Sequence, residues 1–164
     1  LTLWNTYSFF VLYANLDGWS PPADPELRPA GSWPLMDRWL LARLNGLIDE
    51  TTRAMDGYDI ATAARALDGF VDDLSNWYVR LSRRRFWKAG DDPDKGAAYS
   101  TLYTALTTLA RLLAPFTPFV AEEIYQNLVR GQDDAAPASV HLPRWPTGEP
   151  RGSDEGECDR AIPR

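Results

Sequence analysis

Cations and aromatic rings are concentrated in one stretch of the chain, residues 74–88. It reads LSNWYVRLSRRRFWK, so five cations and four aromatic residues fall within fifteen positions. Arginine binds phosphate oxygens through a two-pronged fork, and an indole or phenol ring offers a face on which a base can stack. The chemistry indicated by this stretch is the binding of a polyanion, and RNA suits both residue types.

Six residues of the stretch are candidates for contact with RNA. They are Arg80, Arg83, Arg84, Arg85, Trp87 and Lys88. A helical cation is stabilised by an acid three or four positions earlier, whereas Arg80, Arg84 and Lys88 follow one another at steps of four. They form a ladder of like charges, and its counter-charge must come from outside the helix.

Three sources of that counter-charge are open. RNA phosphates are one, and an acidic face of an adjacent domain is another. The third is the domain's own acidic residues, namely Asp91, Asp92, Asp94, Glu122 and Glu123. Glu122 and Glu123 also fall at the start of a predicted helix, where the helix dipole favours anions. We interpret them as dipole partners rather than as acid–base residues.

The same helix begins with an apolar stripe that leads directly into the basic residues. The stripe comprises Ile60, Ala63, Leu67, Phe70, Val71, Leu74, Trp77, Tyr78 and Leu81. Its three- and four-residue steps are typical of a buried helix face. We therefore expect Trp77 and Tyr78 in the core, and Arg85 or Lys88 pinned against a neighbouring helix. Phe86 and Trp87, at the helix end, are expected to be exposed.

Composition excludes several other chemistries. The chain has one histidine, His141, and one cysteine, Cys158, which leaves no set for a multi-histidine or cysteine-cluster metal site and none for an internal disulfide. A lone cysteine fits a reducing compartment. The net charge is −6; residues 80–88 carry +5, so the rest carries −11. This acidity disfavours general nucleic-acid binding but permits a local basic patch. No apolar run is long enough to span a membrane.

The periodicity predicts an all-α fold of about five helices with no strand. The predicted helices cover residues 3–16, from about 32–34 to 56, 59–88, 93–114 and 118–130. Short connections favour an up-and-down antiparallel bundle. Residues 1–146 are expected to form this domain, with a proline-rich connector at 17–34. Val140–Leu142 is expected to be a short extended piece packed on the bundle, and the polar tail, 147–164, to be disordered.

Four motifs together resemble a known family. They are LMDRWLLARLN, LSNWYVRLSRRRFW, LLAPFTPFVAEEIYQNL and VHLPRWP. They resemble the helical anticodon-binding domain of class Ia aminoacyl-tRNA synthetases, over residues 1 to about 146. The block from Trp77 to Trp87 is similar to the isoleucyl-tRNA synthetases. LAPFTPFVAEEIY also occurs in valyl-type relatives, which leaves those as an alternative.

The resemblance implies a parent enzyme that uses ATP, with magnesium, to join isoleucine to its tRNA in the cytoplasm. It implies that this domain grips the anticodon stem-loop, with the catalytic domain of the same polypeptide as its second partner. DNA and membranes are not expected partners, and a monomer is expected. This chain should be catalytically inert and hold no cofactor, because the family's HIGH-type and KMSKS-type motifs are absent. Two alternatives remain: a strut that docks the catalytic domain, and a free-standing helical module.

Overall fold

The computed structural model describes residues 2–22, 33–88, 90 and 92–148. Most of the predicted connector and tail, together with Ser32, Asp91 and Cys158, lies outside the described residues. The described helices are α1 (Thr2–Asp17), α2 (Leu35–Asp56), α3 (Ile60–Asp72), the π-helical segment η3 (Asp73–Val79), α4 (Arg80–Phe86), α5 (Pro93–Leu113), α6 (Pro118–Tyr125) and the π-helical segment η4 (Gln126–Arg130).

These segments form five continuous helical rods, as the periodicity predicts. The third rod is α3, η3 and α4 joined end to end, and the fifth is α6 followed by η4. The described part of the chain contains no strand. The prediction of an all-α, five-helix fold is therefore confirmed.

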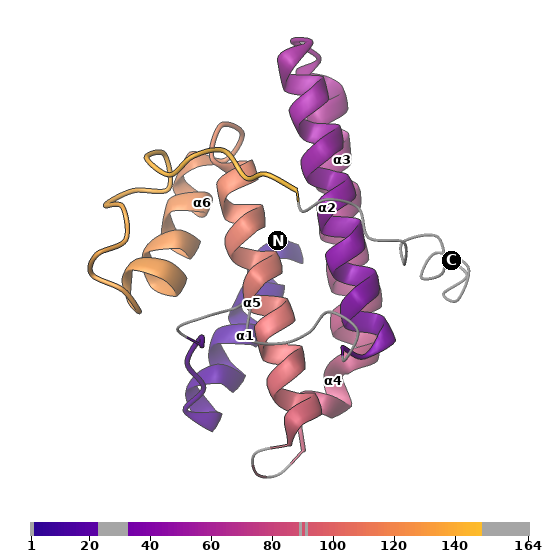
Figure 1. Cartoon of the computed structure of the whole chain (residues 1–164), viewed down its shortest axis with the longest axis vertical. Helices are drawn as coiled ribbons and strands as arrows, with labels where there is room; N and C mark the ends of the chain where they lie inside the picture. The colour runs from indigo at the N-terminus through magenta and orange to yellow at the C-terminus, as the bar shows by residue number, and fades with distance from the viewer. Residues whose placement is uncertain (1, 23–32, 89, 91, 149–164) are drawn as a thin grey trace.

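The rods pack side by side around one core (Figure 1). α2 and α3 form a long antiparallel hairpin, and α5 lies beside α2 and runs in the same direction from the foot of the bundle. α6 packs on α5, and α1 packs on α5 and η3. The core between them is apolar, with fully buried leucines at Leu40, Leu74, Leu102, Leu106 and Leu109.

The basic end of the third rod does not project from the bundle. α4 packs against α5, and the α2–α3 turn is the end that extends past the other helices (Figure 1). Tyr58, in that turn, has a positive φ of 58° and is exposed. The basic end of the third rod is therefore a packed part of the domain.

The π-helical segment η3 shifts the buried stripe of the third rod by one position. Its backbone bonds run from residue i to i+5, so each turn holds more residues than an α-turn. After Leu74 the buried positions are Tyr78, Val79, Ser82 and Phe86, and Leu81 is 57% exposed. The expected burial of Leu81 is wrong for this reason.

Two of the predicted helix starts are confirmed by their caps. The Asp92 carboxylate accepts a hydrogen bond from the Asp94 backbone N–H at 2.8 Å, and Pro93 is the first residue of α5. The Asp59 carboxylate caps α3 by accepting from the Thr62 N–H at 3.0 Å. α2 differs, because its N-cap is Pro34, which has no capping side chain.

The segment 137–146, here called the strap, folds back over the bundle (Figure 1). Val140 is buried in the core and lies in a turn, whereas His141 and Leu142 are exposed. The expectation that Val140–Leu142 is an extended piece is wrong, and only Val140 of the three packs on the bundle. The Glu122 carboxylate accepts from the Ser139 hydroxyl at 2.8 Å and from the Val140 N–H at 2.9 Å. Glu122 is therefore an anchor for the strap. The first turn of α6 contains no acidic residue, so the expected role of Glu122 and Glu123 as helix-dipole partners is wrong.

Candidate nucleic-acid interface

α4 divides the basic residues into an inward and an outward group. Its inward positions are the buried Ser82 and Phe86, beside the largely buried Arg85. Its outward positions are Arg80, Arg83 and Arg84, all exposed. Successive residues of an α-helix point about 100° apart. The orientation of α4 about its own axis therefore decides which residues face the core and which face solvent.

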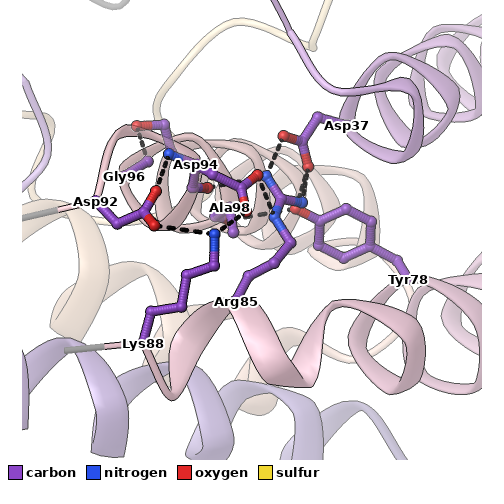
Figure 2. Close-up of polar contacts among 9 residues, drawn as sticks. Asp37, Tyr78, Arg85, Lys88, Asp92, Asp94, Gly96 and Ala98 are labelled. Carbon is purple, nitrogen blue, oxygen red and sulfur yellow. Dashed lines mark hydrogen bonds and ion pairs between the residues drawn. The ribbon is translucent and has the colours of Figure 1, made fainter.

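Arg85 is held inside the domain by two aspartates (Figure 2). Its Nη1 and Nη2 donate to the two carboxylate oxygens of Asp37 at 2.7 and 2.6 Å. Its Nε lies 2.8 Å from a carboxylate oxygen of Asp94, and its Nη2 also donates to the Asp94 carbonyl at 2.9 Å. The guanidinium therefore joins α4 to the first turns of α2 and α5, and the expectation that it is pinned against a neighbouring helix is confirmed.

Asp37 is fully buried and depends on these partners. Its second donor is the hydroxyl of Tyr78, 2.7 Å away, and Tyr78 is itself fully buried as expected. Burial, and then the charge of Asp37, raise the pKa of Tyr78 well above its ordinary value. Removing one partner of a buried ion pair leaves an uncompensated charge and costs about 3–5 kcal/mol.

The environment of Arg85 favours its protonated, positively charged form. Burial alone would lower the pKa of Arg85, but its hydrogen bonds and charge pairing with Asp37, and the charge of Asp94, raise it above the ordinary value for arginine. Arg85 is therefore protonated at any physiological pH. An arginine held in this way links α4 to α2 and α5 within the domain.

Lys88 also finds its counter-charge within the domain (Figure 2). Its Nζ lies 2.9 Å from carboxylate oxygens of both Asp92 and Asp94. Hydrogen bonds with Asp94 and Asp92 raise the pKa of Lys88. Of the three sources of counter-charge, the domain's own acids therefore serve Arg85 and Lys88.

Asp37, the main partner of Arg85, is not among the acidic residues that the sequence patterns suggest as counter-charges, although the sequence contains a signal for its burial. Asp37 lies three residues before Leu40 and seven before Leu44, both on the buried face of α2. An acid at a core-facing position of an amphipathic helix must be paired, because an isolated buried charge is too costly. That rule predicts a buried partner for Asp37.

The three arginines that point outward have a different environment. Within the described part of the chain, Arg80, Arg83 and Arg84 form no ion pair. Trp87 lies beside them with its side chain 58% exposed, and its Nε1 donates to the hydroxyl of Tyr13 on α1 at 2.8 Å. We call Arg80, Arg83, Arg84 and Trp87 the α4 face.

Comparison with known proteins places the chain in a family. The family described as "Anticodon-binding domain of tRNA ligase" matches residues 37–162, which is more than half of the chain. The chain belongs to this family of anticodon-binding domains. The matched region includes the α4 face, Asp37 and Arg85.

Three relatives of this anticodon-binding domain carry the name isoleucine–tRNA ligase. That of Dehalococcoides mccartyi strain 195 is 54% identical over 162 residues, which is 99% of this chain and 16% of the relative. That of Thermus thermophilus is 56% identical over 158 residues, 94% of this chain and 15% of the relative. That of Clostridium novyi is 50% identical over 164 residues, 98% of this chain and 16% of the relative. The chain thus spans about one sixth of the length of these relatives.

The structure of the anticodon-binding domain divides the six candidate RNA contacts. Arg80, Arg83, Arg84 and Trp87 are exposed, whereas Arg85 and Lys88 are tied to aspartates. Trp87 is exposed as expected, but Phe86 is 1% exposed and its expected exposure is wrong. Contact with RNA by any of the six residues stays a prediction.

The described residues of this domain meet the requirements of three kinds of contact to different degrees: a metal ion, a membrane and a phosphate backbone. They include no group of three histidine, cysteine, aspartate or glutamate side chains that could hold a metal ion. His141 is exposed on the strap. No helix among the described residues is long and apolar enough to cross a membrane. The arrangement is suited to electrostatic contact with a phosphate backbone beside one aromatic ring.

Proposed function

We propose that this domain binds the anticodon stem-loop of isoleucine tRNA through the α4 face. The observation that carries the proposal is the cluster of three exposed arginines without an ion-pair partner among the described residues, next to an exposed indole, in a member of the anticodon-binding family. Exposed cations release counter-ions when they meet phosphates, and this release drives RNA binding. The acidic remainder of the surface confines the contact to this face.

The parent protein, on this proposal, is a cytoplasmic, monomeric isoleucine–tRNA ligase. The names of the three relatives support isoleucine over valine as the amino acid. ATP and magnesium would be held by the parent's catalytic part, and we assign no step of the ligation to residues of this domain.

A double charge reversal in the full-length enzyme tests the proposal. Arg83→Glu with Arg84→Glu is expected to raise the dissociation constant for an isoleucine tRNA transcript by about tenfold or more. The matched control is Arg53→Glu with Arg65→Glu, which makes the same change in net charge at two exposed arginines of the α2–α3 hairpin. Equal affinities of the two double variants at low salt would rule out an RNA role for the α4 face.

Leu81 supports a second candidate, in which the α4 face docks the parent's catalytic domain. This leucine is 57% exposed on the same short helix as the arginines. A strut of this kind would make the Arg83→Glu, Arg84→Glu variant slower in isoleucine activation measured by pyrophosphate exchange without tRNA. Unchanged activation together with weaker tRNA binding favours the RNA contact.

A further inference from the structure

Asp37 lies against the inward side of α4 and has no access to solvent. It is fully buried on α2, and its carboxylate meets the guanidinium of Arg85 through two parallel hydrogen bonds (Figure 2). Arg85 directly follows the two outward arginines, Arg83 and Arg84. Whatever holds Arg85 inward therefore also sets the direction in which those arginines point.

The continuity of α4 with η3 and the burial of Phe86 set this rotation only in outline. Phe86 is buried among aromatic rings, and burial of apolar surface is favourable without being directional. An arginine fork on a carboxylate is directional, because both N–H groups must lie in the plane of the two oxygens. α4 is the last two turns of the third rod, beyond the wider turn of η3, and the fork is the directional contact that holds this end of the rod on α2.

We propose that Asp37 is a positioning residue for RNA binding, because its fork with Arg85 fixes the rotation of α4 and aims Arg80, Arg83 and Arg84 at tRNA phosphates. This inference rests on the proposed function. On this inference Arg85 links α4 to α2 and is not itself an RNA ligand. It also gives a role in binding to an acidic residue that no polyanion can touch.

Removing the charge of Asp37 distinguishes a positioning role from a simple electrostatic effect on tRNA affinity. Removing an anion near a phosphate-binding surface makes the local potential more positive and should tighten the binding of RNA. Removing a positioning anion should weaken it, because the exposed arginines lose their common orientation. The two explanations predict opposite changes for Asp37→Asn.

The test measures the affinity of the full-length enzyme for an isoleucine tRNA transcript over a range of salt concentrations. Asp37→Asn and Arg85→Gln are each expected to raise the dissociation constant about tenfold. The double variant is expected to bind no more weakly than either single variant, because both remove the same fork. Hydrogen exchange of the amides of residues 80–88 should quicken, while that of α2 and α5 stays slow.

A matched control comes from the second interhelical arginine–aspartate pair. The Nη2 of Arg43 lies 2.7 Å from a carboxylate oxygen of Asp73, which joins α2 to η3 rather than to α4. Asp73→Asn removes the same charge as Asp37→Asn and breaks a similar pair. We expect its affinity for tRNA to be unchanged or slightly tighter.

Arg85→Lys keeps the cation and removes the fork, so it tests the inference without creating an uncompensated charge at Asp37. We expect it to weaken tRNA binding nearly as much as Arg85→Gln. Wild-type affinity of Arg85→Lys would overturn the inference, and so would unchanged or tighter binding by Asp37→Asn. Loss of affinity in Arg85→Gln alone, with a salt slope smaller by about one phosphate, would make Arg85 a direct RNA ligand.

The double variant Arg83→Glu, Arg84→Glu, measured in parallel, separates the two proposals. Weak binding by this variant with unaltered binding by Asp37→Asn overturns the positioning role and leaves the proposed function standing. Wild-type binding by Arg83→Glu, Arg84→Glu overturns the proposed function, and the positioning role with it. Weak binding by both variants, with a normal Asp73→Asn control, supports both.

Discussion

The ring of Phe86 meets the ring of Phe9 edge to face, with centroids 5.2 Å apart. Tyr99 contacts Phe86 in the same manner at 4.9 Å. Three helices, α1, α4 and α5, therefore meet on one side chain from the basic stretch. Edge-to-face pairs of this kind add about 0.5–1.5 kcal/mol each beyond the burial of the rings.

Phe86→Ala is expected to destabilise the domain by about 3–5 kcal/mol, because it removes a fully buried ring and leaves a cavity. The neighbouring Trp87→Ala, at an exposed ring, should cost much less, about the value of its hydrogen bond to Tyr13, ~1 kcal/mol. Urea unfolding followed by circular dichroism measures both changes. Similar losses for the two variants would contradict the inward placement of Phe86.

Glu122→Gln should weaken the attachment of the strap in a pH-dependent way. Burial alone would raise the pKa of Glu122, but hydrogen bonds from Gln126, Ser139 and the Val140 N–H lower it below the ordinary value of 4.5. A lowered folded-state pKa means that the stabilisation is present above pH 4.5 and is lost as the pH falls through the folded-state pKa.

The wild type should therefore exceed Glu122→Gln in stability by about 1 kcal/mol at pH 7, and the difference should shrink below pH 4.5. Urea unfolding at a series of pH values provides the measurement. Glu123→Gln, at the exposed neighbouring residue, is the control and should show little change at any pH. A gap between wild type and Glu122→Gln that widens on acidification would refute the assignment.

Substitution by alanine is expected to have opposite effects on stability at Gly131 and at Gly69. A Cβ at Gly131 would lie 2.8 Å from the backbone oxygen of Asn127, so Gly131→Ala requires the end of η4 to shift. A Cβ at Gly69, in the interior of α3, would meet nothing within 4 Å. Gly69→Ala should stabilise the domain by about 0.5–1 kcal/mol, because alanine is the better helix former. Thermal melts of the two variants should move in opposite directions.

Trp145→Phe tests the far end of the strap. The indole Nε1 of Trp145 donates to the hydroxyl of Thr52 on α2 at 2.8 Å. Phenylalanine keeps most of the apolar contact but not the donor, so a loss of about 1 kcal/mol is expected. Faster proteolysis of the strap relative to the wild type would accompany it, and equal rates would argue against this tie. His141→Ala, at an exposed position of the strap, is the control.

The local elements of the fold could be predicted because their signals lie within a few residues. Asp92 followed by Pro93 marks the start of α5, and Gly18, with a φ of 63°, follows the end of α1. The burial of Leu67, Leu74 and Tyr78 follows from helical spacing alone. Capping and amphipathicity act over one or two turns, so a single sequence displays them directly.

The π-helical segment η3 was beyond this kind of prediction. Residues 73–79 continue the α-helical spacing, and no local signal in them marks the wider turn. Its consequence is a shift of one residue, which buries Phe86 and exposes Leu81. A pattern that assumes 3.6 residues per turn therefore misplaces residues such as Leu81 and Phe86, which follow such a segment.

The sequence by itself determined the all-α class, the number of helical rods, most of the core and a basic stretch typical of an RNA-binding surface. Only the tertiary structure decided which of the basic residues are free to bind. Arg85 and Asp37 are 48 residues apart, and their pairing exists only because α2, α4 and α5 meet at one end of the bundle. Helical periodicity reports which face of a helix is buried, whereas an ion pair depends on the distance between two helices, which no local pattern contains.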